Sequence, residues 1–158
     1  VIYNAGNTLT QRSMRTVGNE VIIRMDISGM ADGQYAGLTH YASSFSTFGV
    51  CQKGALRMLY YNNNGRDTIG VQLKGKSIWL KSYWDYKGVN QYAYSLNGKK
   101  FIDFGMTSSL SWGYYRGDRI GIFTFNEKEE KGLVDIDWFR YQYTRPGEAT
   151  KQPTGKRK

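Results

Sequence analysis

The chain has 158 residues, which is enough for one domain with its own hydrophobic core and too few for two ordinary domains. No apolar run approaches the roughly 20 residues of a membrane-spanning helix, so we expect no membrane partner. Because Cys51 is the only cysteine, the sequence excludes an internal disulfide and a cysteine-based zinc site. Nineteen glycines against two prolines indicate many tight turns.

The formal net charge is +9, and part of it lies in the tail Lys151–Lys158. Such a charge can mark a protein that binds nucleic acid or acidic polysaccharide. It can also reflect a linker or cloning remnant together with a solvated surface. The other basic residues are scattered and no RNP-like or zinc-finger motif accompanies them, so we favour the second interpretation and expect no nucleic-acid partner. The chain begins with Val1, which indicates an excised fragment or a processed product.

Strands dominate the pattern along the chain. Residues 21–27 alternate apolar Val21, Ile23, Met25 and Ile27 with Arg24 and Asp26, which is typical of a half-buried strand. Further strands are predicted at residues 34–41, 48–52, 56–61, 67–73, 77–83, 92–96, 100–104, 119–125 and 134–143.

Turn signals separate these strands. Asn62–Asp67 reads as a loop, Asn97-Gly98 is the best hairpin signal, and Asn126–Gly132 is a charged loop. About ten to twelve short strands at a spacing of roughly 8–12 residues predict an all-β fold, an antiparallel sandwich of two sheets. We expect this β-sandwich domain at residues 1–144 and a flexible linker or tail at 145–158.

Catalytic groups are scarce. His40 is the only histidine, so any Ser-His-Asp or Cys-His set would need it, but it lies in a strand patterned like a buried one. Asp135 and Asp137 share one face of the last strand, about 6.5–7 Å apart by strand rise. That spacing does not exclude an inverting glycosidase pair, and hard oxygen ligands suit calcium. A structural role at the sheet edge is the third interpretation, and we expect no required cofactor.

Residues 78–86 combine aromatic and polar side chains on one face. Alternation places Trp79, Lys81, Tyr83 and Asp85 opposite the apolar face of Ile78 and Leu80. A sugar ring needs flat aromatics for its apolar face and polar groups for its hydroxyls. We therefore predict a carbohydrate-binding set at this face.

Other residues extend this predicted set: Trp112 and Tyr114 from the loop 111–116, with Gln52 and Arg57 as hydrogen-bonding neighbours. The alternative is that the aromatics only fill the sandwich, as we expect for Trp138, which shares a face with Val134 and Ile136. An aromatic and basic mixture can also bind single-stranded nucleic acid.

Several segments, in order, resemble the domain that follows the five-bladed propeller of family 43 glycoside hydrolases. They are Asn7–Arg12, Asp26–Gly33, Tyr35–Tyr41, Tyr94–Lys99 with Phe101–Gly105, Arg116–Phe123 and Val134–Tyr141. The resemblance implies a concanavalin A-like jelly-roll sandwich without catalytic residues, since the family's Asp/Asp/Glu set lies in the propeller. It also implies an association with xylan or arabinoxylan, and in some xylosidases a loop, here Tyr61–Gly65, that helps close the active site.

The leading hypothesis is a non-catalytic carbohydrate-binding module that recognises xylan-type polysaccharide or another β-glycan. It would raise the local concentration of an attached glycoside hydrolase at the polymer. We expect an extracellular, secreted monomer. The second hypothesis is a structural domain that packs on its propeller and binds no glycan, and the third is a small glycosidase.

Overall fold

The computed structural model describes residue 2, residues 7–113 and residues 117–145. The strands of this part are β1 Asn7–Arg12, β2 Asn19–Asp26, β3 Gln34–Tyr41, β4 Phe45–Lys53, β5 Leu56–Asn63, β6 Arg66–Gln72, β7 Ser77–Trp84, β8 Val89–Ser95, β9 Ile102–Ser109, β10 Arg119–Asn126 and β11 Asp135–Tyr143. None of the described residues forms a helix that could cross a bilayer. The predicted all-β class is confirmed, while the predicted tail at 145–158 falls almost wholly outside the described residues.

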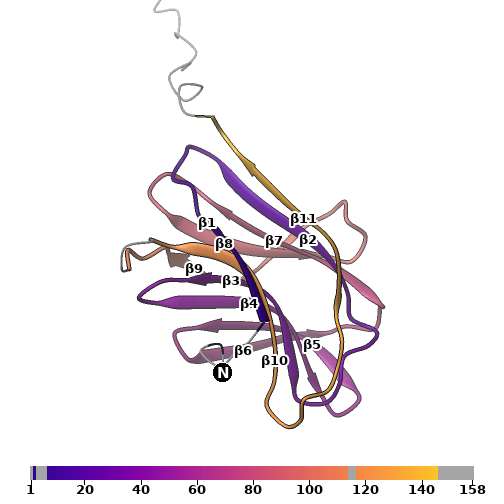
Figure 1. Cartoon of the computed structure of the whole chain (residues 1–158). Coiled ribbons are helices and arrows are strands. Elements are labelled where there is room, and N and C mark those ends of the chain that lie inside the picture. The colour runs from indigo at the N-terminus through magenta and orange to yellow at the C-terminus, as the bar shows by residue number, and fades with distance from the viewer. Residues whose placement is uncertain (1, 3–6, 114–116, 146–158) are drawn as a thin grey trace, which may run out of the picture.

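The strands form two layers, shown in Figure 1. Sheet A has the order β1-β10-β3-β4-β5-β6, and sheet B has the order β11-β2-β7-β8-β9. Every neighbouring pair is antiparallel. The arrangement is a two-sheet sandwich, as the spacing of strands and turns predicted.

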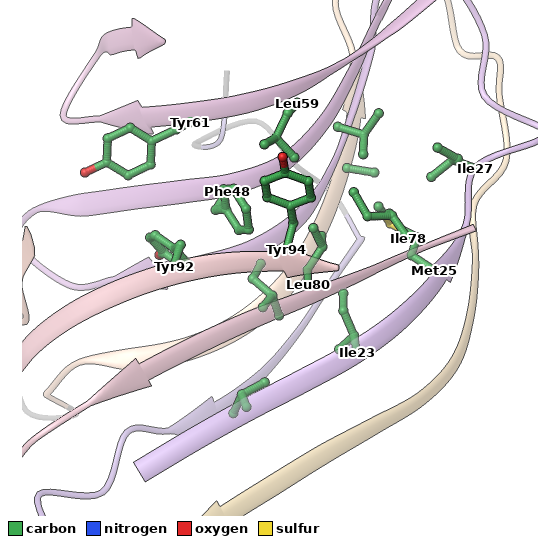
Figure 2. Close-up of a cluster of buried hydrophobic side chains, with 14 of the residues drawn as sticks. Ile23, Met25, Ile27, Phe48, Leu59, Tyr61, Ile78, Leu80, Tyr92 and Tyr94 are labelled. Atoms are coloured by element: carbon green, nitrogen blue, oxygen red, sulfur yellow. The ribbon is translucent and has the colours of Figure 1, made fainter. Parts of the chain in front are cut away.

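The core lies between the inner faces of the sheets. In β7, Ile78 and Leu80 are fully buried while Trp79, Lys81 and Tyr83 alternate with them on the outer face. Phe48 of sheet A stacks on Tyr92 of sheet B, with ring centroids 5.1 Å apart, toward the left of the cluster in Figure 2. Strand alternation is thus the property that directs one set of β7 side chains inward and the other outward.

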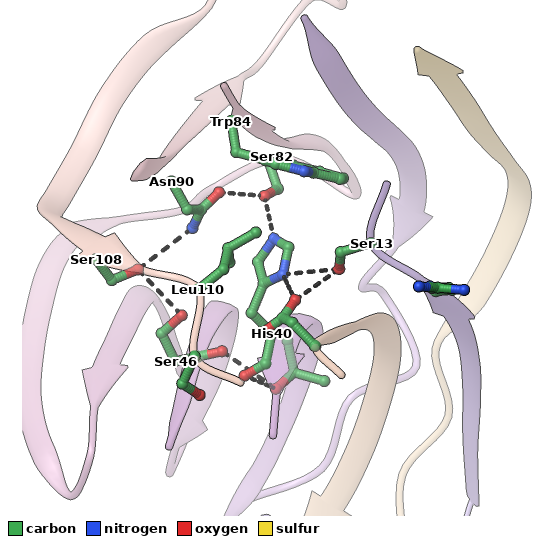
Figure 3. Close-up of polar contacts among 12 residues, drawn as sticks. Ser13, His40, Ser46, Ser82, Trp84, Asn90, Ser108 and Leu110 are labelled. Carbon is green, nitrogen blue, oxygen red and sulfur yellow. Dashed lines mark hydrogen bonds and ion pairs between the residues drawn. The ribbon is translucent and has the colours of Figure 1, made fainter. Parts of the chain in front are cut away.

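A polar network crosses this core, as Figure 3 shows. His40 Nδ1 lies 2.7 Å from Asp118 Oδ1, which also accepts a 2.6 Å hydrogen bond from Ser13 Oγ. His40 Nε2 lies 2.9 Å from Ser82 Oγ, and that hydroxyl donates to Asn90 Oδ1 over 2.6 Å. The network ties β3 of sheet A to β7 and β8 of sheet B.

The serine, histidine and aspartate of this network resemble a catalytic triad in composition only. Ser82 is fully buried and gives its hydroxyl hydrogen to Asn90 instead of His40, so His40 does not activate it as a nucleophile. His40 itself is 2% exposed. The burial that the strand pattern predicted for this histidine is confirmed.

The two-residue hairpin turns lie elsewhere than the strongest signal indicated, and one of them, Gly54-Ala55, joins the paired residues Lys53 and Leu56. Asn64 and Gly65 both have positive φ, 48° and 89°, and join the paired residues Asn63 and Arg66 in the manner of a type I′ turn. At Asn97-Gly98 the link between β8 and β9 is longer, and Asn97 Oδ1 accepts from the backbone amides of Lys99 and Lys100. The ring of Trp79 packs against Gly98 there.

A β-bulge in β11 changes the faces of its side chains. The pairing with β2 shifts between Ile136 and Trp138, so Asp137 is the extra residue. Phe139 packs against the core, whereas Trp138 stays outside the core cluster and lies beneath the guanidinium of Arg140, 4.8 Å from the ring centroid. The expectation that Trp138 fills the core was wrong, because strict alternation fails at a bulge.

Buried tyrosines make stability sensitive to alkaline pH. Burial raises the pKa of Tyr35 to about 12 and also raises the pKa of Tyr60 and Tyr92, because a phenolate would lose its hydration. The unfolded chain releases these protons near pH 10, so above that pH the unfolded state binds fewer protons and is favoured. We expect the free energy of unfolding to fall from about pH 10 upward. Urea unfolding at a series of alkaline pH values checks this, and a constant value through that range would contradict it.

Candidate functional site

A groove of about 880 Å³ runs across the outer face of sheet B. Its side chains come from four of the sheet's strands, β2, β7, β8 and β9, from the end of β11, and from the turns at one end of the sheet. The described lining residues are Val17, Gly18, Asn19, Glu20, Lys81, Tyr83, Trp84, Asp85, Val89, Gln91, Asp103, Thr107, Gln142, Tyr143 and Thr144. Three members of the predicted carbohydrate-binding set, Lys81, Tyr83 and Asp85, therefore lie in one groove.

The register of the sheet places Tyr83 in a polar row. Tyr83 pairs with Glu20 of β2 on one side and with Gln91 of β8 on the other. Glu20 pairs in turn with Gln142 of β11. Residues that are directly opposite share a face of the sheet, so an aromatic ring is flanked along this row by two amides and a carboxylate.

Tyr83 is held in place by Asp103 of β9. Its hydroxyl donates to both carboxylate oxygens, at 3.0 Å and 3.1 Å. Partial burial, followed by the neighbouring Asp103 charge, raises the pKa of Tyr83, so the hydroxyl stays protonated and keeps donating. The ring consequently has a fixed orientation, which suits it to act as a stacking surface.

Lys81 lies between a carboxylate and two rings. Its ammonium pairs with Glu20 and lies 5.2 Å from the Tyr83 ring centroid and 5.4 Å from that of Phe101. The stem of Lys81 thus runs along the aromatic surface while the charge is neutralised by Glu20. The ammonium contributes a directed donor and little net positive potential.

The ends of the groove are held by backbone contacts. Asp85 Oδ1 accepts from the amide of Val89, 3.1 Å away, across the turn after β7. Gln91 Nε2 donates to the carbonyl oxygens of Tyr92 and Phe104, where the pairing of β8 with β9 is irregular. Its Oε1 atom can accept a hydrogen bond from a ligand.

The same outer face continues beyond the groove to Trp79. Arg24 of β2 pairs with Trp79 on one side and Trp138 on the other, and its guanidinium lies 5.3 Å from the Trp79 ring centroid. Trp79 and Tyr83 are four residues apart on one strand, about 13 Å by strand rise. The face is therefore long enough for several sugar rings in a row.

Three predicted site residues, Gln52, Arg57 and Trp112, lie apart from this groove. Gln52 and Arg57 belong to sheet A, where Gln52 Nε2 donates to the Gly54 carbonyl and Arg57 Nη1 donates to the Ile27 carbonyl. Trp112 is 77% exposed in the loop after β9, next to Ser43, and does not line the groove. Tyr114 lies outside the described residues.

The predicted metal pair is exposed. Asp137 pairs with Arg24, whose positive charge opposes a cation at that carboxylate, and Asp135 lies opposite Asp26. In the part of the chain that the structure describes, no three His, Cys, Asp or Glu side chains gather to hold a metal. Calcium binding by this pair stays a prediction, which a calcium titration tests.

The groove is acidic although the chain is basic. Its described lining carries three carboxylates, from Glu20, Asp85 and Asp103, and one ammonium, from Lys81. A phosphate backbone would be repelled there, whereas carboxylates are strong acceptors for hydroxyl groups. The chemistry of the groove fits a neutral polymer rich in hydroxyls.

The sequence matches a known protein family and a curated relative. A family model described as the beta xylosidase C-terminal concanavalin A-like domain matches residues 3–142. The chain is 34% identical over 148 residues to a beta-xylosidase of Formosa agariphila. The match covers 91% of this chain and 24% of that protein, so the chain spans about a quarter of its curated relative.

Solved structures show the same sandwich within larger chains. One is a GH43 glycoside hydrolase whose engineered active site is described as giving both endo-xylanase and exo-arabinofuranosidase activity. It matches with a TM-score of 0.78 and 24% identity, over 87% of this chain and 31% of its own. A bifunctional GH43-CE protein of Bacteroides eggerthii matches with a TM-score of 0.79 and 24% identity over 90% of this chain and 19% of its own. The GH43 protein BlXynB of Bacillus licheniformis matches with a TM-score of 0.71 and 21% identity, covering 87% and 29%.

Proposed function

Because the chain belongs to the family of beta-xylosidase C-terminal concanavalin A-like domains, we propose that it binds xylan-type polysaccharide along the outer face of sheet B. It does so as a non-catalytic module of a glycoside hydrolase. The catalytic partner would be a propeller domain of the same parent chain. The parent enzyme would act outside the cell, on plant cell-wall polysaccharide. Binding through the module raises the concentration of the catalytic domain at the polymer.

The observation that carries this proposal is the polar row around Tyr83. A ring fixed by Asp103 is flanked by Glu20, Gln91 and Lys81 in a groove on an exposed sheet face. Aromatic stacking on the apolar face of a sugar and side-chain hydrogen bonds to its hydroxyls need this combination. Neither contact requires a metal, so binding is expected to be independent of calcium.

A structural role on the propeller is the second candidate, and one observation favours it. Sheet A carries a second apolar cluster on its outer face, formed by Tyr35, Cys51, Tyr60 and Phe123. These side chains are themselves buried, but Ile69 of β6, which pairs with Tyr60, is 39% exposed beside them, and exposed apolar surface is typical of an interface. The two roles use opposite sheets, so the domain can pack through sheet A and bind glycan through sheet B.

Affinity electrophoresis against a polysaccharide panel tests the proposed function. We expect xylan or arabinoxylan in the gel to retard the domain, in the presence and absence of a chelator, while carboxymethylcellulose, a polyanion, retards it less. If the domain migrated in gels with xylan, arabinoxylan and neutral β-glucan as fast as in a gel without polysaccharide, glycan binding would be contradicted. The structural role would then be left.

A further inference from the structure

A second cavity, of about 450 Å³, opens on the outer face of sheet A. The two sheets pack face to face, so this cavity and the sheet B groove are on opposite sides of the sandwich. Its volume lies within the range of about 300–1,000 Å³ that is common for small-ligand pockets. We propose that it binds one or two neutral sugar residues, as a site separate from the groove.

One side of the cavity is aromatic. The ring of Tyr35 stacks on Phe125 with centroids 5.0 Å apart and 16° between the planes, and Tyr60 meets Tyr35 edge-on at 4.8 Å. Tyr35 and Tyr60 are 8% and 5% exposed, so their rings are fixed by packing. They hold in place the ring of Phe125, which is partly exposed and offers a sugar an apolar surface with little loss of side-chain entropy on binding.

The polar part of the lining is organised by the β5–β6 hairpin and adjoins Tyr60. Asp67 Oδ1 accepts from Tyr60 Oη over 3.2 Å and also from Asn62 Nδ2. Asn62 Oδ1 in turn accepts a 2.9 Å hydrogen bond from the amide of Gly65 in the type I′ turn. Both donors reach the same oxygen of Asp67, so its Oδ2 atom can accept from a ligand hydroxyl.

The charge of the cavity selects the kind of sugar. Among its described lining residues, Asp67 and Glu127 are the charged side chains, and both are acidic. Two carboxylates accept hydrogen bonds from hydroxyls and repel an acidic sugar. The aromatic wall and the acidic rim together fit a neutral pentose or hexose residue and disfavour a uronic acid.

The test is a titration of the whole chain, carrying Tyr83→Ala to impair the groove, with xylose, arabinose, xylobiose and glucuronic acid. Backbone amide shifts in ¹H–¹⁵N spectra report where each sugar binds. We expect saturable shifts at Thr47, Gly65 and Asp67 with a neutral sugar, and at least about tenfold weaker binding of glucuronic acid.

Two variants separate the proposal from its alternatives. Asp67→Ala is expected to weaken binding of the neutral sugar by about tenfold or more, because it removes a charged acceptor. The control Glu129→Ala makes an equal charge change in the exposed loop after β10 and should leave binding unchanged. The Tyr83→Ala background impairs the sheet B groove in every titration. The result for the sheet A cavity therefore does not depend on whether the groove binds xylan. Absence of saturable shifts at the cavity with every neutral sugar, or equal affinity for glucuronic acid, would overturn the proposal.

Discussion

Replacing Asp118 with alanine is expected to lower the free energy of unfolding by about 2 kcal/mol or more, because two buried polar partners are left unsatisfied at about 1–3 kcal/mol each. Asp118 accepts from Ser13 and lies 2.7 Å from His40 Nδ1, and the side chains of His40 and Asp118 are each 3% exposed. Without the carboxylate, His40 and Ser13 lose their partner in a site that water barely reaches. The network would then lose the carboxylate that links Ser13 to His40.

Urea unfolding followed by tryptophan fluorescence measures this effect, because the Trp84 ring lies edge-on to His40 at 4.9 Å. The matched control is Asp137→Ala, which removes an aspartate paired with Arg24 at the surface, where both side chains are 37–40% exposed. Exposed pairs contribute about 0–1 kcal/mol. If Asp118→Ala cost no more than Asp137→Ala, the buried carboxylate would not stabilise the fold.

Replacing Tyr83 with alanine is expected to weaken binding to xylan by more than about tenfold, which corresponds to at least 1.4 kcal/mol. The substitution removes the ring on which a sugar would stack, and it also releases Asp103 from its two hydrogen bonds. Tyr83 is partly exposed on the outer face. We therefore expect little change in stability, and the retardation in affinity gels measures the change in affinity.

Two further variants show which property of Tyr83 matters. Tyr83→Phe keeps the ring and loses the hydroxyl, so it should retain most of the affinity if stacking dominates. Trp112→Ala removes an aromatic that is 77% exposed and lies outside the groove, so retardation should be unchanged. A loss of affinity with Trp112→Ala and none with Tyr83→Ala would move the site to the loop after β9.

The sequence predicted which face of β7 each side chain occupies. Alternation from Ile78 to Trp84 is regular because one face is packed against sheet A and the other is not. The ordered family motifs predicted the sandwich itself. Both predictions depend on properties that are local to a strand or to its turns.

The partners of Tyr83 could not be predicted in this way. Glu20, Gln91 and Gln142 are brought to its row by the register of three strand pairs, which a single sequence does not specify. Asp103, which fixes the ring, lies 20 residues away on β9. For the same reason Gln52 and Arg57 were assigned to the site although they belong to the other sheet.

The cavity on sheet A was missed for a different reason. In β3, Tyr35, Ala36 and the following residues through His40 are all buried, so alternation is hidden and the strand reads as core on both faces. Only the separation of two apolar clusters shows that Tyr35 and Tyr60 face outward. The Asn-Gly pair at 64–65 is a sequence signal for the adjacent turn. A two-residue hairpin at this pair predicts that Asn62 lies opposite Asp67, which is the pairing observed.

The most direct test of glycan recognition on sheet B is a titration of the domain with a xylo-oligosaccharide, followed by backbone amide shifts in ¹H–¹⁵N spectra. We expect saturable shifts at Glu20, Lys81, Tyr83, Gln91 and Asp103, whose side chains line the groove. Shifts that are absent from these residues, or confined to sheet A, would contradict recognition in this groove.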